Sequence, residues 1–206
     1  MPLDLNCDLG ESYGKYVSRY DAQIMPWISS CNIACGFHSG DPLTIARSIR
    51  LALEQGVAIG AHPSFPDLQG FGRRVMTLGA EELGACIRYQ VAALKGMTES
   101  LGGKLQHVKP HGALYHVLTA EENLAAVFAE VIGEIDETLR VFGPPGSCLE
   151  QACAQRGLAF RAEVFADRRY EADLRLRSRA LPGAVLGEEE ALEQARRLAV
   201  EGRVMT

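Results

Sequence analysis

The segment KLQHVKPHGALYH, residues 104–116, decides the predicted fold. Leu105 and Val108 are typical of a buried strand, and the Pro-His-Gly turn that follows ends it. Lys109 and His111 therefore stand at the point where the strand stops. Because parallel α/β proteins collect reactive side chains beyond the carboxyl ends of their strands, we expect a functional site at this end.

Three other segments repeat this pattern of an apolar run followed by polar residues with Gly or Pro. They are DLNCDLGE at 4–11, CNIACGFHSGDP at 31–42 and VAIGAHPSFPD at 57–67. Two further strands are expected at about 139–142 and 158–166. Strand–helix units of this kind, without a Rossmann glycine signature, predict an α/β fold with a parallel β/α barrel. The sequence also lacks the P-loop, G-x-S-x-G and HExxH motifs.

Helical patterns lie between these strands. Thr119 and Glu122 fit a capping box at the start of one helix. A seventh strand is expected to begin at 203–206. The remaining helices are expected at about 41–55, 80–101, 148–156 and 188–201.

The first strand carries an unusual set of polar side chains. Asp4, Asn6 and Asp8 alternate along it and so share one face, and Glu11 follows its end. Carboxylates and an amide suit a polar cleft or a hard-cation site better than an apolar core. An edge strand with one wet face is the alternative interpretation.

Histidines stand at two other strand ends. His38 lies between two glycines, just before a helix that Asp41 and Pro42 are expected to start. The glycines permit close approach to a ligand, and the helix N-terminus favours an anionic group. His62 ends the following strand. A purely structural histidine at position 38 is the alternative.

A glycine-rich loop after the third strand, GFGRR at 70–74, carries two cations. The planar guanidinium of an arginine there is suited to binding a carboxylate or a phosphate. A solvated pair made by Arg73 and Arg74 is the alternative.

Composition limits the class of protein. With 206 residues, one domain spanning 1–206 is the natural prediction. The net charge of −5 argues against nucleic-acid binding as a default. No long apolar run or secretory leader is visible, so we expect a cytoplasmic protein that does not cross a membrane. Six cysteines fit reduced thiols, and the spacing of Cys31 and Cys35 lacks the second pair of a zinc ribbon.

Five motifs taken in order carry a resemblance to a known family. DLNCDLGE, SCNIACGFHSGDP, IGAHPSFPD with GFGRR, HVKPHGALY and EVFADRRY resemble the LamB/YcsF family, from residue 3 to about residue 200. The resemblance implies a distorted seven-stranded β/α barrel, similar to the glycoside hydrolase and polysaccharide deacetylase superfamily. Family members usually continue for some tens of residues, through a strand that ends in His-Gly-Asp and a final helix. An end at Thr206 would leave the barrel open at one side.

The resemblance also implies an activity. Family members serve as the A subunit of the prokaryotic ATP-dependent 5-oxoprolinase, which cleaves 5-oxo-L-proline to L-glutamate with hydrolysis of ATP to ADP and phosphate. The 5-oxoprolinase subunits B and C are the implied partners. The implied cofactors are ATP and Mg²⁺, with another divalent metal as an option. Whether ATP binds this chain, and whether the chain forms a homo-oligomer, stay open.

The chemistry of lactam hydrolysis then assigns roles to the strand-end residues. Water activation needs carboxylates or a base, and the charge on phosphate or on the lactam oxygen needs a cation. We expect catalytic roles for Asp8, His62, Lys109 and His111. A strand-end salt link is the alternative for Lys109 and His111. Residues expected to line the substrate site are Asn6, Glu11, Asn32, His38, Arg73, Arg168 and Arg169.

Two other functions are consistent with the sequence. A metal-dependent deacetylase or carbohydrate hydrolase would use a metal held by Asp8, His38 and His62, and would need no ATP. A non-catalytic scaffold subunit would instead expose a large apolar patch and tolerate changes at the expected catalytic positions.

Overall fold

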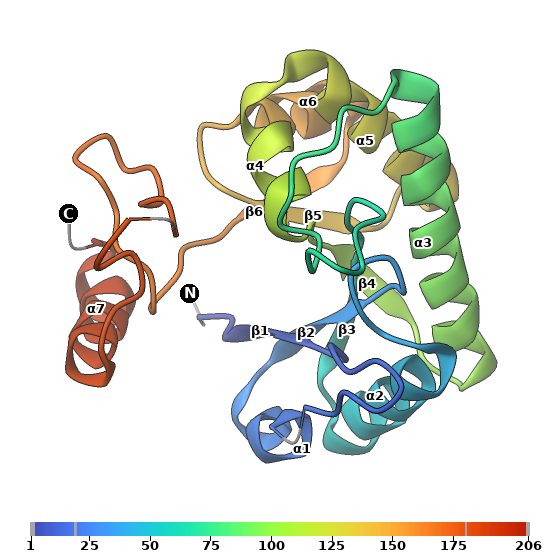
Figure 1. Ribbon diagram of the computed structural model, residues 1–206, viewed down its shortest axis with the longest axis horizontal. Coiled ribbons are helices and arrows are strands. Elements are labelled where there is room, and N and C mark those ends of the chain that lie inside the picture. Colours follow the sequence, from blue (N-terminus) through green and yellow to red (C-terminus); the bar gives the residue numbers. More distant parts are fainter. Residues whose placement is uncertain (1–2, 19, 180, 205–206) are drawn as a thin grey trace. The chain divides into compact units, whose positions relative to one another are not determined.

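The computed structural model describes residues 3–18, 20–179 and 181–204. Within them, six parallel strands form one sheet in simple chain order, as Figure 1 shows. The strands are β1 (Asn6–Leu9), β2 (Ser30–Ala34), β3 (Ala58–His62), β4 (Leu105–Val108), β5 (Arg140–Gly143) and β6 (Ala159–Ala162). This order, with a crossover between each pair of neighbours, defines a parallel β/α half-barrel in the described part of the chain.

Helices fill the crossovers. They are α1 (Asp21–Ile24), the 3₁₀ turn η1 (Met25–Trp27), α2 (Pro42–Gln55), α3 (Ala80–Ser100), α4 (Gly112–Ala120), α5 (Glu122–Ile135), α6 (Cys148–Arg156) and α7 (Glu188–Glu201). The chain divides into two compact units. The sheet unit, Asp4–Glu163, holds all six strands and α1 to α6. The C-terminal unit starts at Val164, includes Leu3 and holds α7.

The expected capping at α2 is confirmed. The Asp41 side chain accepts hydrogen bonds from the backbone N–H groups of Leu43 and Thr44, and Pro42 occupies the first helical position. Gly56 ends the helix in the left-handed region. The start of α2 therefore fixes the loop in which His38 stands.

The capping box expected at residue 119 is wrong. Thr119 lies inside α4, where its hydroxyl donates to the carbonyl of Tyr115. A separate helix, α5, begins at Glu122 without a side-chain cap. The apolar run after Gly112 contains a helix of its own, because it buries residues such as Leu114 and Leu118 against the core.

The sixth strand is shorter than the predicted span of 158–166. Ala162 pairs with Gly143, the last residue of β5, and no later partner continues the ladder among the described residues. Glu163 therefore stands just after a strand end and not within the strand. The strand expected at 203–206 is absent at 203 and 204, and 205–206 lie outside the described residues.

The two faces of the sheet differ in chemistry. Residues such as Cys31, Ile33, Ile59 and Val108 pack with the helices in the hydrophobic core. The stripe of α3 that packs there comprises Leu83, Ile87, Val91 and Leu94. The alternate positions include buried polar side chains, among them Asn32, His62 and His107. The sheet thus separates an apolar, helix-covered face from a polar one.

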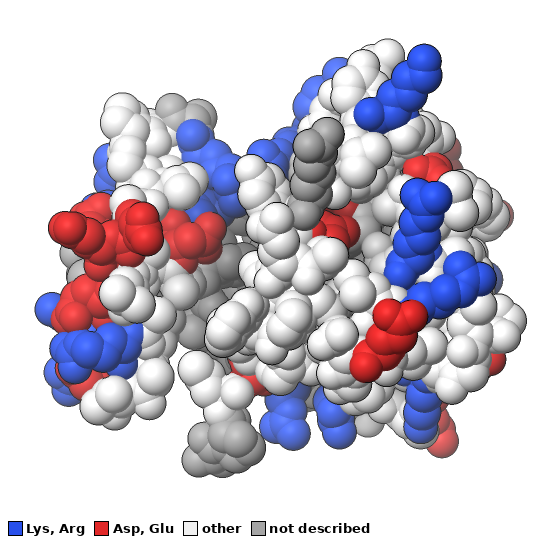
Figure 2. All heavy atoms as spheres, turned by 90° about the horizontal axis from the view of Figure 1, so that it is seen from below, with Lys and Arg blue, Asp and Glu red and all other residues white. Residues whose placement is uncertain are grey.

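Surface properties agree with the composition. Acidic and basic side chains both occur on the face in Figure 2, and much of that face carries neither. Among the described helices, none has the length and apolar character needed to cross a membrane.

Candidate active site

The register of the sheet brings polar residues of neighbouring strands into one row. Asp8 on β1 pairs with Asn32 on β2, and Asn32 pairs with Gly60 on β3. Gly60 in turn pairs with His107 on β4. Partners in parallel strands point to the same face, so these residues share the polar face of the sheet.

Asp8 is held by three different groups. Its Oδ1 lies 3.0 Å from Nζ of Lys109 and accepts a 2.7 Å hydrogen bond from Nδ2 of Asn32. Its Oδ2 lies 3.3 Å from Nε2 of His62. Burial alone would raise the pKa of Asp8, but the charges of His62 and Lys109 outweigh it and hold this pKa well below its usual value. Asp8 is therefore an ionised carboxylate at neutral pH.

Lys109 lies between two carboxylates. Its Nζ is 3.3 Å from Oε2 of Glu163 as well as 3.0 Å from Asp8. Burial opposes the charged form of Lys109, yet the two carboxylates raise its pKa above the ordinary value. Burial raises the pKa of Glu163. The side chain of Asp8 is 33% exposed, whereas that of Lys109 is 6% exposed, so this row of charges opens to solvent at Asp8.

Two backbone carbonyls fix the tautomers of a histidine pair. Nδ1 of His62 donates to the carbonyl of Lys109 at 2.7 Å, and Nε2 of His111 donates to the carbonyl of Phe71 at 2.8 Å. The remaining nitrogens, Nε2 of His62 and Nδ1 of His111, lie 3.0 Å apart. Because the other two nitrogens carry the protons that bond to the carbonyls, a hydrogen bond between Nε2 of His62 and Nδ1 of His111 requires one further proton, shared by the pair.

Burial, together with the neighbouring His62 and His38, lowers the pKa of His111 to about 3. His62 is then placed to return a proton to, or take one from, a group bound next to Asp8. The geometry of the histidine pair is therefore suited to proton transfer at the strand ends.

Glu11, His38 and His111 place ligand atoms within 4.8 Å of one another. The rings of His38 and His111, however, are stacked, with centroids 3.7 Å apart and planes 2° from parallel. Histidine binds metals in the plane of its ring, so two parallel rings cannot direct their nitrogens at one ion. The geometry does not fit a metal shared by these residues. The ligand set Asp8, His38 and His62 stays a prediction.

The loop after β3 covers the histidines. Gly72 has φ +63°, and a Cβ there would lie 2.8 Å from the His111 ring and 2.9 Å from His38. Arg74 is held by Asp67 through bonds of 2.9 and 3.1 Å from its Nε. Arg73 is exposed, and its guanidinium carbon lies 5.1 Å from the centroid of the Phe71 ring. Burial raises the pKa of Glu11, and the charge of Arg73 is close enough to oppose that rise, which places this arginine at the edge of the site.

We call seven residues the strand-end cluster: Asp8, Glu11, His38, His62, Lys109, His111 and Glu163. They come from five strand ends and are joined by contacts of 3.0–3.6 Å and by the histidine stack. Asn6 and Asn32 lie behind it, with Nδ2 of Asn6 donating to Oγ of Ser30 at 2.8 Å and to Oδ1 of Asn32 at 3.2 Å. The sequence did not identify Glu163 or His107 as site residues. The position of Glu163 just after β6, and that of His107 in β4 two residues before Lys109, could have identified them.

Arg168 and Arg169 belong to the C-terminal unit and have partners inside it. Arg168 is buried and donates to the carbonyls of Ala184 and Arg177 at 3.1 and 2.7 Å. Arg169 donates to the carbonyl of Gly183 and pairs with Glu190. These contacts give both arginines structural roles in their unit, and their expected contact with substrate stays a prediction.

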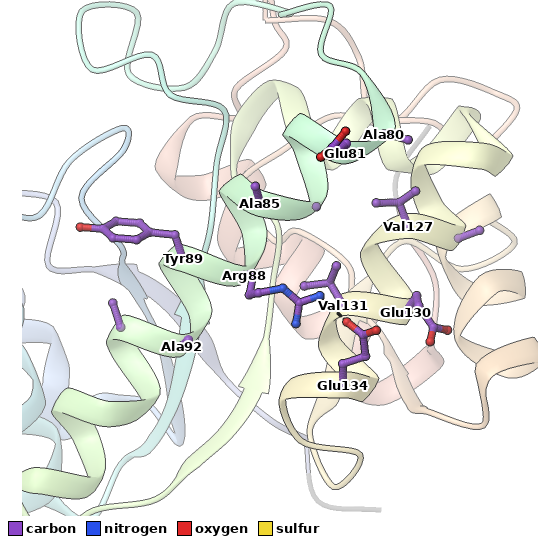
Figure 3. A pocket seen from close by; sticks show the side chains of 13 residues that line it. Ala80, Glu81, Ala85, Arg88, Tyr89, Ala92, Val127, Glu130, Val131 and Glu134 are labelled. Atoms are coloured by element: carbon purple, nitrogen blue, oxygen red, sulfur yellow. Dashed lines mark hydrogen bonds and ion pairs between the residues drawn. The ribbon is translucent and has the colours of Figure 1, made fainter.

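A separate groove of about 1090 Å³ lies between α3 and α5 (Figure 3). Its walls are largely alanine and valine, and Arg88 of α3 reaches across to Glu134 of α5. None of the strand-end cluster lines it. The side chains of Arg88 and Glu134 are 51% and 45% exposed, whereas His38, His62, Lys109 and His111 are buried, so we assign the chemistry to the strand ends.

The fold and the site define a class: a parallel β/α protein with a cluster of charged residues and histidines at the carboxyl ends of its strands. Within that class the chain belongs to the LamB/YcsF family, whose model matches residues 3–206. It is 49% identical to the 5-oxoprolinase A subunit of Tolumonas auensis, with 98% of this chain and 81% of that protein covered. It is also 49% identical to the 5-oxoprolinase A subunit of Symbiobacterium thermophilum, over 98% and 78% of the two chains.

A solved structure agrees with this membership. The crystal structure of a lactam utilization protein from Thermus thermophilus is 43% identical and superposes with a TM-score of 0.94. The match covers 99% of this chain and 83% of that one. The expected family is therefore confirmed.

Proposed function

We propose that this chain is the A subunit of an ATP-dependent 5-oxoprolinase. In this proposal it cleaves the lactam of 5-oxo-L-proline to L-glutamate, with hydrolysis of ATP to ADP and phosphate, together with subunits B and C. The names of the two relatives and of the Thermus protein support the assignment. The observation that carries it is the row in which Lys109 lies between the ionised Asp8 and Glu163, beside the His62–His111 pair.

A five-membered lactam is a stable amide, so its hydrolysis near neutral pH needs activation. Transfer of the γ-phosphoryl group of ATP to the lactam oxygen would make the ring carbon more electrophilic toward water. The site must then accept a proton from water, supply one to the departing amine and stabilise anionic oxygen. The strand-end cluster contains a group suited to each of these tasks.

Asp8 and His62 are the proposed water-activating groups, because the ionised carboxylate and the imidazole lie 3.3 Å apart. Lys109 would stabilise the lactam oxygen or the transferred phosphoryl group, since its cation is held in place by Asp8 and Glu163. His111 would act as the acid–base partner of His62 across their 3.0 Å contact. Glu163 joins the proposal as the residue that holds the second side of Lys109.

Substrate binding is proposed for the groups around these. Arg73 is suited to the carboxylate of 5-oxoproline, because it is a guanidinium at the exposed edge of the site, close enough to act on Glu11. His38 lies 3.3 Å from Glu11 in the same site. Asn6 and Asn32 would contribute through the orientation of Asp8.

Two arginines and a metal ion complete the binding proposal. Arg168 and Arg169 are proposed to contact the substrate. Mg²⁺ would enter with ATP, because Lys109 already occupies the place between Asp8 and Glu163 where a cation would bind these carboxylates.

Several further features belong to the proposal. They are the seven-stranded form of the barrel, its superfamily relationship, binding of ATP by this chain, the cytoplasmic location and the choice between monomer and homo-oligomer. The metal-dependent hydrolase is less well supported, because the ammonium group of Lys109 already lies 3.0 Å from Asp8, one of the three metal ligands that this function requires. A scaffold role leaves the buried charges of the strand-end cluster unexplained, since buried charges are costly to keep.

The decisive experiment measures glutamate formed from 5-oxoproline and ATP by this chain alone, by the chain with its two partners and by the partners alone. We expect glutamate only from the full set, and none from a set that contains Asp8→Asn. Glutamate from the chain alone would overturn the complex-dependent proposal. Release of acetate from acetylated sugars without ATP would instead favour the metal-dependent hydrolase.

A further inference from the structure

His107 lies behind the strand-end cluster, and the proposed reaction does not use it. Its side chain lies on β4, and the residue is 2% exposed. Nε2 of His107 is 2.8 Å from Oδ1 of Asn32, which belongs to β2, two strands away in the sheet. The ring also stacks on Phe142, with centroids 4.2 Å apart. A histidine built in this way is held in one orientation.

The absence of a side chain at Gly60 makes this contact available. Gly60 stands between Asn32 and His107 in the row of register partners. A Cβ at position 60 would lie 2.1 Å from Nε2 of His107. Any side chain at position 60 would therefore force the His107 ring out of its place. Because Gly60 has no side chain, the imidazole of His107 can lie over β3 and reach Asn32 on β2.

An irregularity in the strand pairing brings His107 to that gap. Ile59 pairs with Leu105 and Gly60 with His107, so Gln106 is the extra residue on β4. An extra residue of this kind redirects the side chains that follow it. With regular pairing, Gly60 would face Gln106, which is exposed in the structure. The bulge and the glycine thus act together on one imidazole.

The direction of the hydrogen bonds follows from the charge on Asp8. An ionised carboxylate only accepts, so Asn32 must turn its amide N–H toward Asp8, as it does at 2.7 Å. Its carbonyl oxygen then faces His107, and Nε2 of His107 must be the donor. Asn32 is fully buried, and its amide has no water to turn to. Losing the His107 donor would leave that carbonyl with only the longer, 3.2 Å bond from Nδ2 of Asn6, so the amide would be held less firmly in this orientation.

We propose that His107 is a positioning residue, which locks the Asn32 amide so that it holds the Asp8 carboxylate in line with Lys109 and His62. This inference rests on the proposed function for its effect on rate, but not for the geometry itself. The groups facing Asp8 are His62, Lys109 and, through Lys109, Glu163. Asn32 also contacts Asp8, through its Nδ2, and it is a fully buried residue of the neighbouring strand β2.

Two variants and a control test the rate effect in the assembled complex. His107→Leu keeps apolar contact with Phe142 but removes the donor, whereas His107→Gln keeps an N–H donor at a similar distance from the backbone. We expect His107→Leu to lower kcat by about tenfold to a hundredfold with little change in KM, and His107→Gln to recover most of it. His116→Gln on the exposed side of α4 is the matched histidine control and should behave as wild type. A wild-type rate for His107→Leu, or no recovery with glutamine, would overturn the proposal.

A second experiment needs neither enzyme activity nor a substituted protein, so it tests this inference separately from the proposed function. Nitrogen-15 NMR of the wild-type chain should show His107 neutral with its proton on Nε2, slow to exchange with solvent and close in space to the Asn32 amide. A proton on Nδ1 would overturn the positioning role. If the wild-type complex makes no glutamate while the Nε2–H signal is present, the proposed function fails and the positioning geometry stands.

Discussion

Nζ of Lys109 lies 3.0 Å from Oδ1 of Asp8, although 101 positions separate the two residues in the chain. The parallel sheet makes this possible, because the carboxyl ends of β1 and β4 open on the same edge. Glu163, after β6, completes the row on the other side of Lys109. The ammonium group is therefore both the proposed electrophilic group and the counter-ion of two carboxylates.

That double role predicts the behaviour of Lys109→Met. We expect loss of oxoprolinase activity and a fall in the free energy of unfolding by about 3–5 kcal/mol, because two carboxylates lose their common partner. Adding Glu163→Gln should restore part of the stability but none of the activity. Urea unfolding and the glutamate assay measure the two effects. Equal stability of the single and the double variant would contradict this account of the row.

The His62–His111 pair gives a second prediction. His62→Gln removes the shared proton beside Asp8, so kcat/KM should fall by about 10²-fold to 10⁴-fold. The exposed His116→Gln is again the control, and its kcat/KM should stay near the wild-type value. Steady-state kinetics of the assembled complex check both. A His62→Gln enzyme as fast as the control would remove His62 from the proposed mechanism.

Gly72 gives a third prediction, because it combines a left-handed φ of +63° with close approach to His38 and His111. Gly72→Ala should lower both stability and activity, since the added methyl group displaces the stacked rings. Gly96 lies within α3, where an added Cβ meets nothing within 4 Å. Gly96→Ala should therefore stabilise the chain by about 0.5–1 kcal/mol at unchanged activity. Thermal unfolding and the glutamate assay distinguish the pair, and an unaffected Gly72→Ala would argue against close packing over the rings.

The buried histidines predict a loss of stability in acid. Burial lowers the pKa of His107 to about 3, from an ordinary value of 6.5. Between these values the unfolded chain binds more protons than the folded one, so the free energy of unfolding falls as the pH drops from 6.5 toward 3. One such group contributes about 1.4 kcal/mol per pH unit.

Urea unfolding of the wild type and of His107→Gln at a series of pH values measures this contribution. The free energy of unfolding of the variant should fall less steeply with decreasing pH, by the slope that corresponds to about one bound proton. His38, with its pKa lowered to about 2, and His111, with its pKa lowered to about 3, keep some acid sensitivity in both proteins. Identical slopes would show that His107 is not held neutral by the fold.

The C-terminal unit gives a fifth prediction. Arg168 joins the carbonyls of Ala184 and Arg177, so Arg168→Lys should destabilise this unit by about 1–3 kcal/mol. Arg169→Lys, at a partly exposed pair with Glu190, should cost less than about 1 kcal/mol. Hydrogen exchange of α7 reports on the unit directly. A raised KM for 5-oxoproline in Arg168→Lys, at unchanged hydrogen exchange, would support the expected substrate contact instead.

The sequence predicted most of the strands and the long helices, because periodicity and caps are local signals. It also predicted that Asp8, His38, His62, Lys109 and His111 would meet, since each follows an apolar run of a parallel fold. Thr119 was placed wrongly, because a capping pattern cannot reveal that a short helix already contains it.

The partners of each residue could not be read from the sequence. Glu163 was assigned to a strand because nothing local shows where β5 stops pairing. The role of His107 depends on Gly60 and on the bulge at Gln106, which are properties of strand register. Register is set by packing across the sheet, and one sequence does not display it.

The bulge on β4 has a consequence for quality control of the folded chain. A slip of one residue between β3 and β4 would leave the sheet compact while placing Ile59 or Ala61 against the imidazole that now crosses at Gly60. Such a molecule would keep its helical content and still be inactive. Specific activity in preparations of this protein should accordingly report on how accurately the sheet was assembled, more sensitively than circular dichroism does.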